Sequence, residues 1–183
     1  YAAGAGTLEE FKHDFLALAN RMGARGAKRI AVVADGAEPL WNLVRECIPN
    51  PIEIQDYWHV CERLHGLAAD LYGSEIEEKK KRAKQWCHQL WEGRVSSLIT
   101  ELCALRRGKR GKKRKRISEE INYLEKGKHR MDYARYRAEG WPIGSGAIEG
   151  TCKHLVKERF GITGARWRRE QIQDVLALRL AQF

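Results

Sequence analysis

The chain has 183 residues, 43% of them hydrophobic, so it can bury a core and is not a disordered tail. Its formal net charge of +10 favours a polyanionic partner, and nucleic acid fits better than an anionic membrane. No stretch approaches the ~18–20 apolar residues of a transmembrane helix, which argues against a membrane protein. We expect one domain, or one domain with an insertion.

The first part of the chain alternates between helix and strand patterns. Thr7 and Glu10 form a capping box, and apolar residues then recur every three or four positions, which predicts an amphipathic helix ending at Gly23. The apolar run 29–34 is rich in β-branched residues, as in a strand buried on both faces. A second helix should begin near Pro39, because proline suits a first helical turn.

A second strand is predicted at 52–55, after a break at Pro49. The order helix, strand, helix, strand is typical of a parallel α/β fold. From residue 57 to about 139 the pattern becomes helical, with no strand signal. We therefore divide the chain into an α/β part, residues 1–60 and 141–183, and a helical insertion at 61–140.

The insertion contains a strongly basic run at 106–116, in which nine of eleven residues are Lys or Arg. Self-repulsion should keep this run exposed and poorly ordered until it meets an anion. It is a phosphate-binding segment, a solvated loop or a localisation-like tract. Further helices are predicted over 118–136, from the turn at 144–146 to about 159, and over 168–181.

Acidic residues follow both predicted strands. Asp35 comes after the first strand and Asp56 after the second, and sites in parallel α/β folds form at the carboxyl ends of strands. Asp35 could equally cap the next helix, with Glu38 completing the box. Two such acids together are less readily explained as caps. His59, one helical turn after Asp56, is either a site residue or a partly buried histidine with a backbone partner.

A Gly-Ser-Gly turn at 144–146 precedes a predicted helix with Glu149 in its opening turns. Glycines permit close approach of a ligand, and a helix start presents free N–H groups to phosphate. Glu149 could instead pair with Lys153 four residues later. The turn lacks the Gly-Lys-Ser/Thr ending of a P-loop, which argues against a nucleotide-binding loop.

Asp35 and Glu149 together suggest a site for a hard metal ion, Mg²⁺ or Mn²⁺. Two such ions can activate an attacking oxygen and stabilise a leaving oxygen in phosphodiester chemistry. Such a site usually needs three acids, and the third is not obvious. The five cysteines are odd in number and form no C-x-x-C motif, which indicates reduced thiols in the cytoplasm. A zinc site using Cys61 is the weaker alternative.

Short motifs stand in order along nearly the whole chain: Val-Val-Ala-Asp-Gly-Ala-Glu at 32–38, Asp-Tyr-Trp-His at 56–59, His-Arg-Met-Asp-Tyr at 129–133, Gly-Trp-Pro-Ile-Gly-Ser-Gly at 140–146 leading to Glu149, Cys-Lys at 152–153 and Arg-Trp at 166–167. With these motifs the chain resembles the DDE transposases of bacterial insertion sequences. The ISKra-type group is the closest match, and the ISLre-type group is a relative.

The resemblance implies a ribonuclease H-like catalytic fold with a helical insertion between the second and third acids of a triad. Asp35 matches the second acid and Glu149 the third, and each would hold one of two Mg²⁺ or Mn²⁺ ions. Asp56 and His59 match an accessory Asp-x-x-His motif. The side chains expected to contact DNA are Lys109, Arg110, Lys112, Lys113, Arg114, Lys153, Arg159, Arg166 and Trp167. Trp167 would either stack on a base or pack in the core.

The family's first aspartate should precede the helix that starts at Leu8, and the chain begins too late to contain it. We therefore expect the C-terminal portion of a transposase, unable to cut DNA alone. The whole enzyme would act on transposon ends and target DNA as a homodimer or larger assembly, near the bacterial nucleoid. The main alternative is a non-catalytic nucleic-acid-binding module whose acids are structural, and a nucleotide-binding protein is the other.

Overall fold

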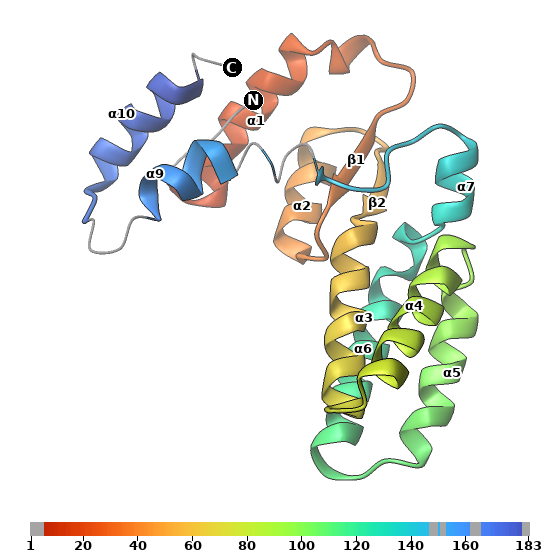
Figure 1. Ribbon diagram of the computed structural model, residues 1–183. Coiled ribbons are helices and arrows are strands. Elements are labelled where there is room, and N and C mark those ends of the chain that lie inside the picture. The colour runs from red at the N-terminus through yellow and green to blue at the C-terminus, as the bar shows by residue number, and fades with distance from the viewer. Residues whose placement is uncertain (1–5, 147–149, 151–152, 162–165, 181–183) are drawn as a thin grey trace. The chain divides into compact units, whose positions relative to one another are not determined.

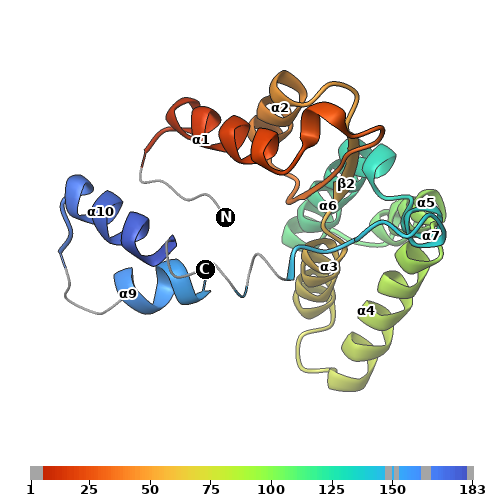
Figure 2. The same cartoon turned by 90° about the horizontal axis from the view of Figure 1, so that it is seen from above.

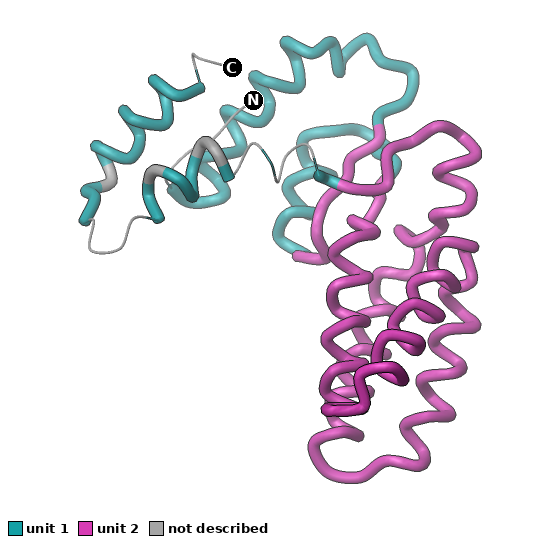
Figure 3. The backbone as a smooth tube through the Cα atoms, viewed as in Figure 1, with its two compact units in different colours: residues 1–30, 38–52, 145–183 teal, residues 31–37, 53–144 magenta. Residues whose placement is uncertain are grey.

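The structure is a computed structural model that describes residues 6–146, 150, 153–161 and 166–180. The chain forms two compact units (Figure 3). Unit 1 comprises residues 1–30, 38–52 and 145–183, and unit 2 comprises residues 31–37 and 53–144. The predicted insertion, 61–140, therefore lies within unit 2, together with β1 and most of β2.

Unit 1 begins with the predicted amphipathic helix, α1 (Leu8–Arg21). The capping box is present, because Thr7 Oγ1 accepts the Glu10 N–H and the Thr7 N–H donates to the Glu10 carboxylate. A 3₁₀ turn, η1 (Ala24–Gly26), follows Gly23, whose φ of 82° favours glycine. Helix α2 (Glu38–Cys47) packs against α1, and Lys12 of α1 pairs with Glu46 of α2 at 2.6 Å.

The described residues of the C-terminal part of unit 1 are mainly helical, as predicted. It contains a π-helical segment, η3 (Lys153–Lys157), continued by α9 (Glu158–Phe160), and the longer α10 (Arg169–Leu180). Helix α10 packs against η3, and Leu176 is its buried residue.

Two short strands, β1 (Ala31–Ala34) and β2 (Ile52–Gln55), pair in parallel. Ile52 N–H donates to Ile30 O and Asp56 N–H to Ala34 O, both at 2.8 Å, so the register is the same at each end. The expectation that β1 is buried on both faces is wrong, because all four of its residues are only half-buried. Among the described residues the sheet has just these two strands, so β1 lacks a neighbour on one side.

Four helices form the body of unit 2: α3 (Tyr57–Tyr72), α4 (Ile76–Trp91), α5 (Val95–Arg107) and α6 (Gly111–Gly127). Each packs against the next in sequence, and α3 also packs against α6, which closes a four-helix bundle (Figure 1). Figure 2 shows the same helices from above. Short loops make neighbouring helices antiparallel. Fully buried Leu64, Trp86, Leu98 and Leu124 supply its core.

The predicted helix over 118–136 is interrupted. A 3₁₀ turn, η2 (Lys128–Arg130), follows α6, and Asp132 then caps the short helix α7 (Tyr133–Ala138) by accepting the Arg135 N–H. The buried Arg130 guanidinium binds Glu53 at 2.5 Å, which ties η2 to β2. Among the helices that the structure describes, none combines the length and hydrophobicity needed to cross a bilayer.

The expectation that the whole basic run is poorly ordered is wrong, because residues 111–116 form the opening turns of α6. These turns are anchored to α3. Lys113 Nζ donates to Leu71 O at 2.6 Å, and Arg116 binds Asp70 at 3.0 Å and Glu120 at 2.9 Å. Partners on α3 and burial of Ile117 therefore offset the repulsion among the cations.

Candidate functional site

The two acids that follow the strands stand at the same end of the sheet. Asp56 N–H donates to Ala34 O at 2.8 Å, so the ladder aligns the residue after β2 with the last residue of β1. Asp35 is the next residue along. The parallel pairing thus brings Asp35 and Asp56 to one carboxyl edge, where sites of parallel α/β folds form.

Asp35 presents an exposed carboxylate at this edge. Its Oδ1 accepts the N–H of Ala37 at 3.1 Å, which stabilises the turn just before α2. Because α2 begins at Glu38, this bond gives Asp35 a role in the turn before the helix without placing it at the N-cap position that the capping-box alternative requires. Because a carboxylate offers about four acceptor positions, the side chain can also bind a ligand.

Asp56 has a structural role in α3. It is 2% exposed and is the N-cap of α3, since Oδ1 accepts the N–H of Trp58 at 2.8 Å and of His59 at 3.1 Å. Asp56 therefore caps α3, and its accessory role in the proposed site stays a prediction. The His59 imidazole is exposed, with Nδ1 4.0 Å from Glu62 Oε2.

The segment that leads towards Glu149 is attached to the same edge. Tyr57 N–H donates to Ile143 O at 2.8 Å. Beside it, Gly144 lies so close to the Trp58 indole that a Cβ at Gly144 would stand 2.5 Å from Cδ1. The first turn of α3 therefore holds the start of the Gly-Ser-Gly turn.

Trp58 is a residue whose importance the sequence analysis missed. Its side chain is 61% exposed although it is large and aromatic, and its ring packs edge to face on Tyr57. An exposed tryptophan beside a carboxylate edge can stack on a base. The available signal was its position directly between Asp56 and His59 in the Asp-Tyr-Trp-His motif.

The polar side chains of Tyr123 and Gln55 pack against the Asp35 turn. A Cβ on Gly36 would stand 2.8 Å from the Tyr123 ring and 2.9 Å from Gln55 Nε2, so the turn rests directly on both side chains. Burial raises the pKa of Tyr123, while the Gln55 amide and the Arg63 guanidinium oppose this shift. Arg63 stacks over the Tyr123 ring with Cζ 3.7 Å from its centroid.

Arg63 also belongs to an ion-pair network between α3 and α6. The fully buried Glu120 accepts two bonds from Arg63, both at 3.1 Å, and one from Arg116 at 2.9 Å. Arg116 continues to Asp70 at 3.0 Å. Because every charge in this network has a partner, it positions α6 and with it Tyr123 under the Asp35 turn.

The basic residues predicted to contact DNA lie around the start of α6 and in the C-terminal part of unit 1. Lys113 is engaged with Leu71 O, as described above. Lys109 and Arg110 lie between α5 and α6, whereas Lys112 and Arg114 lie in the first turns of α6. An open groove of about 500 Å³ is lined by Asp70, Lys112, Lys113, Lys115, Arg116 and Glu119. Lys113 and Arg116 are held by the partners described above, and Lys115 lies 4.0 Å from Glu119, so Lys112 is the lining cation that takes part in no ion pair among the described residues.

The C-terminal candidates belong to unit 1. Lys153 and Arg166 are exposed. Trp167 is half-buried and packs edge to face on Phe160, with ring centroids 5.3 Å apart, which agrees with the packing role considered for it. Glu149 and the side chain of Arg159 lie outside the part of the chain that the structure describes.

Among the described residues, no group of three or more His, Cys, Asp or Glu side chains is arranged to hold a metal ion. Interaction with the Cys87 thiol lowers the pKa of Cys61. The Asp35 carboxylate suits a hard cation, and its pairing with Glu149 stays a prediction.

The chain was compared with protein-family models, with curated proteins and with solved structures, and no match was found in any of the three.

Proposed function

We propose that the chain is the C-terminal portion of a DDE-type DNA transposase with a ribonuclease H-like catalytic fold. The observation that carries the proposal is the convergence at the edge of the sheet. Parallel pairing brings Asp35 beside Asp56, and the Tyr57–Ile143 bond brings the segment before Glu149 to the same place. Segments far apart in the chain, around residues 35, 56 and 143, thus lie at one edge, which supports the proposal of a divided carboxylate site.

The half-buried strand β1 agrees with an incomplete fold. Its apolar residues have one neighbouring strand among the described residues, and a two-stranded sheet is marginally stable by itself. In the proposed enzyme further strands, including the one with the first acid, would pair with this sheet. By itself the chain would therefore bind DNA without cutting it.

In the proposed reaction, Asp35 and Glu149 would each hold Mg²⁺ or Mn²⁺. When bound, the metal ions would activate the attacking oxygen and stabilise the leaving oxygen of the scissile phosphodiester. Asp56 would act indirectly, by fixing the first turn of α3 and with it the Gly144 turn. The exposed cations near the start of α6, among them Lys112 and Arg114, would hold the DNA backbone, which makes binding strongly salt-dependent.

The test uses the longer protein that contains this chain, on DNA carrying the element's ends. Asp35→Ala and Glu149→Ala should each abolish Mn²⁺-dependent cleavage while DNA binding, measured by gel shift, is retained. As a matched control, Asp14→Ala removes an exposed acid of α1 and should leave cleavage unchanged. Retained cleavage in both site variants would contradict the proposal.

The capping role of Asp56 favours the second candidate, a non-catalytic nucleic-acid-binding module. In that case the acids serve only to shape turns. The longer protein would then bind DNA with the same salt dependence and show no metal-dependent cleavage, so the same experiment separates the two functions.

A further inference from the structure

Two polar side chains of unit 2 converge on the residue that follows Asp35. An ideal Cβ on Gly36 would stand 2.9 Å from Gln55 Nε2 and 3.1 Å from Tyr123 Oη, with Cε2 of the Tyr123 ring at 2.8 Å. Gln55 is the last residue of β2, whereas Tyr123 belongs to α6. The Asp35 turn therefore packs on one hydrogen-bond donor from each of two separate elements.

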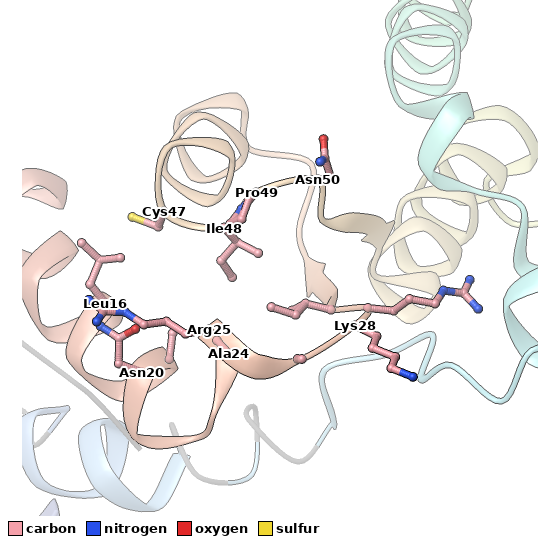
Figure 4. A pocket seen from close by; sticks show the side chains of 13 residues that line it. Leu16, Asn20, Ala24, Arg25, Lys28, Cys47, Ile48, Pro49 and Asn50 are labelled. Atoms are coloured by element: carbon pink, nitrogen blue, oxygen red, sulfur yellow. The ribbon is translucent and has the colours of Figure 1, made fainter.

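The pocket of about 570 Å³ in unit 1, formed by α1, the η1 turn and the turn after α2, is arranged differently (Figure 4). Its cations Arg25 and Lys28 lie at opposite ends of the pocket. The two asparagines, Asn20 and Asn50, also lie at opposite ends, and all four side chains are exposed. These groups do not gather around one point, whereas the two side chains beside Asp35 meet at a single residue.

The polar atoms of these two side chains are buried without partners. Gln55 is 1% exposed, and neither its Nε2 nor its Oε1 forms a hydrogen bond within the described residues. The same holds for the buried Tyr123 Oη. A buried polar atom without a partner costs about 1–3 kcal/mol, so apolar side chains would serve the fold at least as well. Stability alone therefore does not account for the amide and the hydroxyl.

Both side chains are also held from the side that faces away from the turn. Gln55 Oε1 lies against Gly127, where a Cβ would clash with it, so the amide fits between Gly127 and Gly36. The Tyr123 ring is covered by the Arg63 guanidinium, with Cζ 3.7 Å from the ring centroid. The ion-pair network between α3 and α6 fixes Arg63 in turn. Both donors are thus preset against the turn.

We propose that Gln55 and Tyr123 are positioning residues for Asp35. By packing against Gly36 they would hold the turn in which the Ala37 N–H donates to Asp35 Oδ1 at 3.1 Å, and so fix the direction of the carboxylate. A carboxylate that is already oriented loses less freedom when it binds an ion. The inference rests on the proposed function, in which Asp35 holds Mg²⁺ or Mn²⁺.

Hydrogen exchange of the full chain, read by NMR, measures the turn directly. Tyr123→Phe and Gln55→Leu each remove the polar group and leave an apolar side chain in its place. Exchange at the Ala37 amide should become about tenfold faster in each, because the turn loses its support. The Arg135 amide, which donates to Asp132 Oδ1 at the start of α7, is the internal control in unit 2 and should keep its rate. Urea unfolding should show that stability is preserved or raised, since an unpartnered polar group is lost.

Tyr133→Phe is the matched control variant. Its Oη is likewise buried without a hydrogen bond within the described residues, but it is not among the three atoms nearest to the Gly36 Cβ position. This variant should leave exchange at Ala37 unchanged. In the longer protein, Tyr123→Phe and Gln55→Leu should raise the Mn²⁺ concentration for half-maximal cleavage about tenfold at unchanged DNA affinity, and Tyr133→Phe should not.

The proposal is overturned if exchange at Ala37 is unchanged in both variants, or if Arg135 accelerates equally. It is also overturned if Asp35→Ala abolishes cleavage while both variants keep the Mn²⁺ dependence of the unaltered protein. Cleavage that survives Asp35→Ala contradicts the proposed function itself, and with it the metal role of the two residues. The exchange rates decide separately whether these residues hold the turn.

Discussion

Replacing Gly144 by alanine tests whether Trp58 holds the turn that leads towards Glu149. The new Cβ would stand 2.5 Å from Trp58 Cδ1 and 2.8 Å from Nε1, against about 3.4–4 Å for an ordinary contact. The indole must therefore move by about 1 Å or more. Because Trp58 is 61% exposed, it can move into solvent rather than distort the backbone.

The expected cost is moderate. Overpacking typically costs about 1–3 kcal/mol, and the exposed ring places this site at the lower end. Alanine also reduces the entropy of the unfolded chain, which returns about 0.4–1 kcal/mol where the backbone is compatible. The structure gives Gly144 no positive φ, so we expect a net destabilisation of about 1 kcal/mol.

Urea unfolding of the chain, followed by circular dichroism, measures this change. Gly146→Ala is the matched control, because nothing lies within 4 Å of its Cβ position. In a Trp58→Ala background the cost of Gly144→Ala should disappear, since the ring is gone. The reasoning is refuted if Gly144→Ala behaves like Gly146→Ala, or if its cost persists without Trp58.

Three further predictions concern unit 2. Glu120→Gln should lower the free energy of unfolding by about 2–3 kcal/mol, because two arginines lose a fully buried partner, and a urea-unfolding loss below about 1 kcal/mol would contradict the network. Tyr133 Oη is buried and forms no hydrogen bond within the described residues, so Tyr133→Phe should preserve or raise stability at pH 7. Burial also raises the Tyr133 pKa, so the stability that neutral Tyr133 contributes is fully present below pH ~10 and is lost above it. Between pH ~9 and ~11 the free energy of unfolding should therefore fall less for Tyr133→Phe than for the unaltered chain. Lys112→Ala should weaken duplex DNA binding and reduce its salt slope by about 1 without changing stability, whereas Lys113→Ala should also destabilise the fold; equal effects of both on unfolding would refute this division.

Much of the secondary structure could be predicted because its signals are local. The capping box at Thr7 and Glu10 is present, the second strand has the predicted bounds, and the helical character of residues 57–139 is confirmed. Capping and periodicity act over three or four residues, so they can be read from neighbours in the sequence. The parallel α/β pairing followed from the order of these elements.

The site was predictable only in outline. Strand order was sufficient to bring Asp35 and Asp56 to one edge, but not to separate their roles. Asp56 is a buried cap, whereas Asp35 remains exposed. The two positions look alike in the sequence. The burial that distinguishes them depends on segments that pack against them from elsewhere in the chain.

The sequence by itself determined the basic charge, the positions of the caps and most helices, and the acids that follow the strands. Only the tertiary structure decided which basic side chains are structural, since the partners of Lys113 and Arg116 lie on α3. It also decided that Glu120 is a buried ion-pair centre and that Trp58 contacts Gly144. These contacts join residues tens of positions apart, and no local pattern encodes the packing that brings them together.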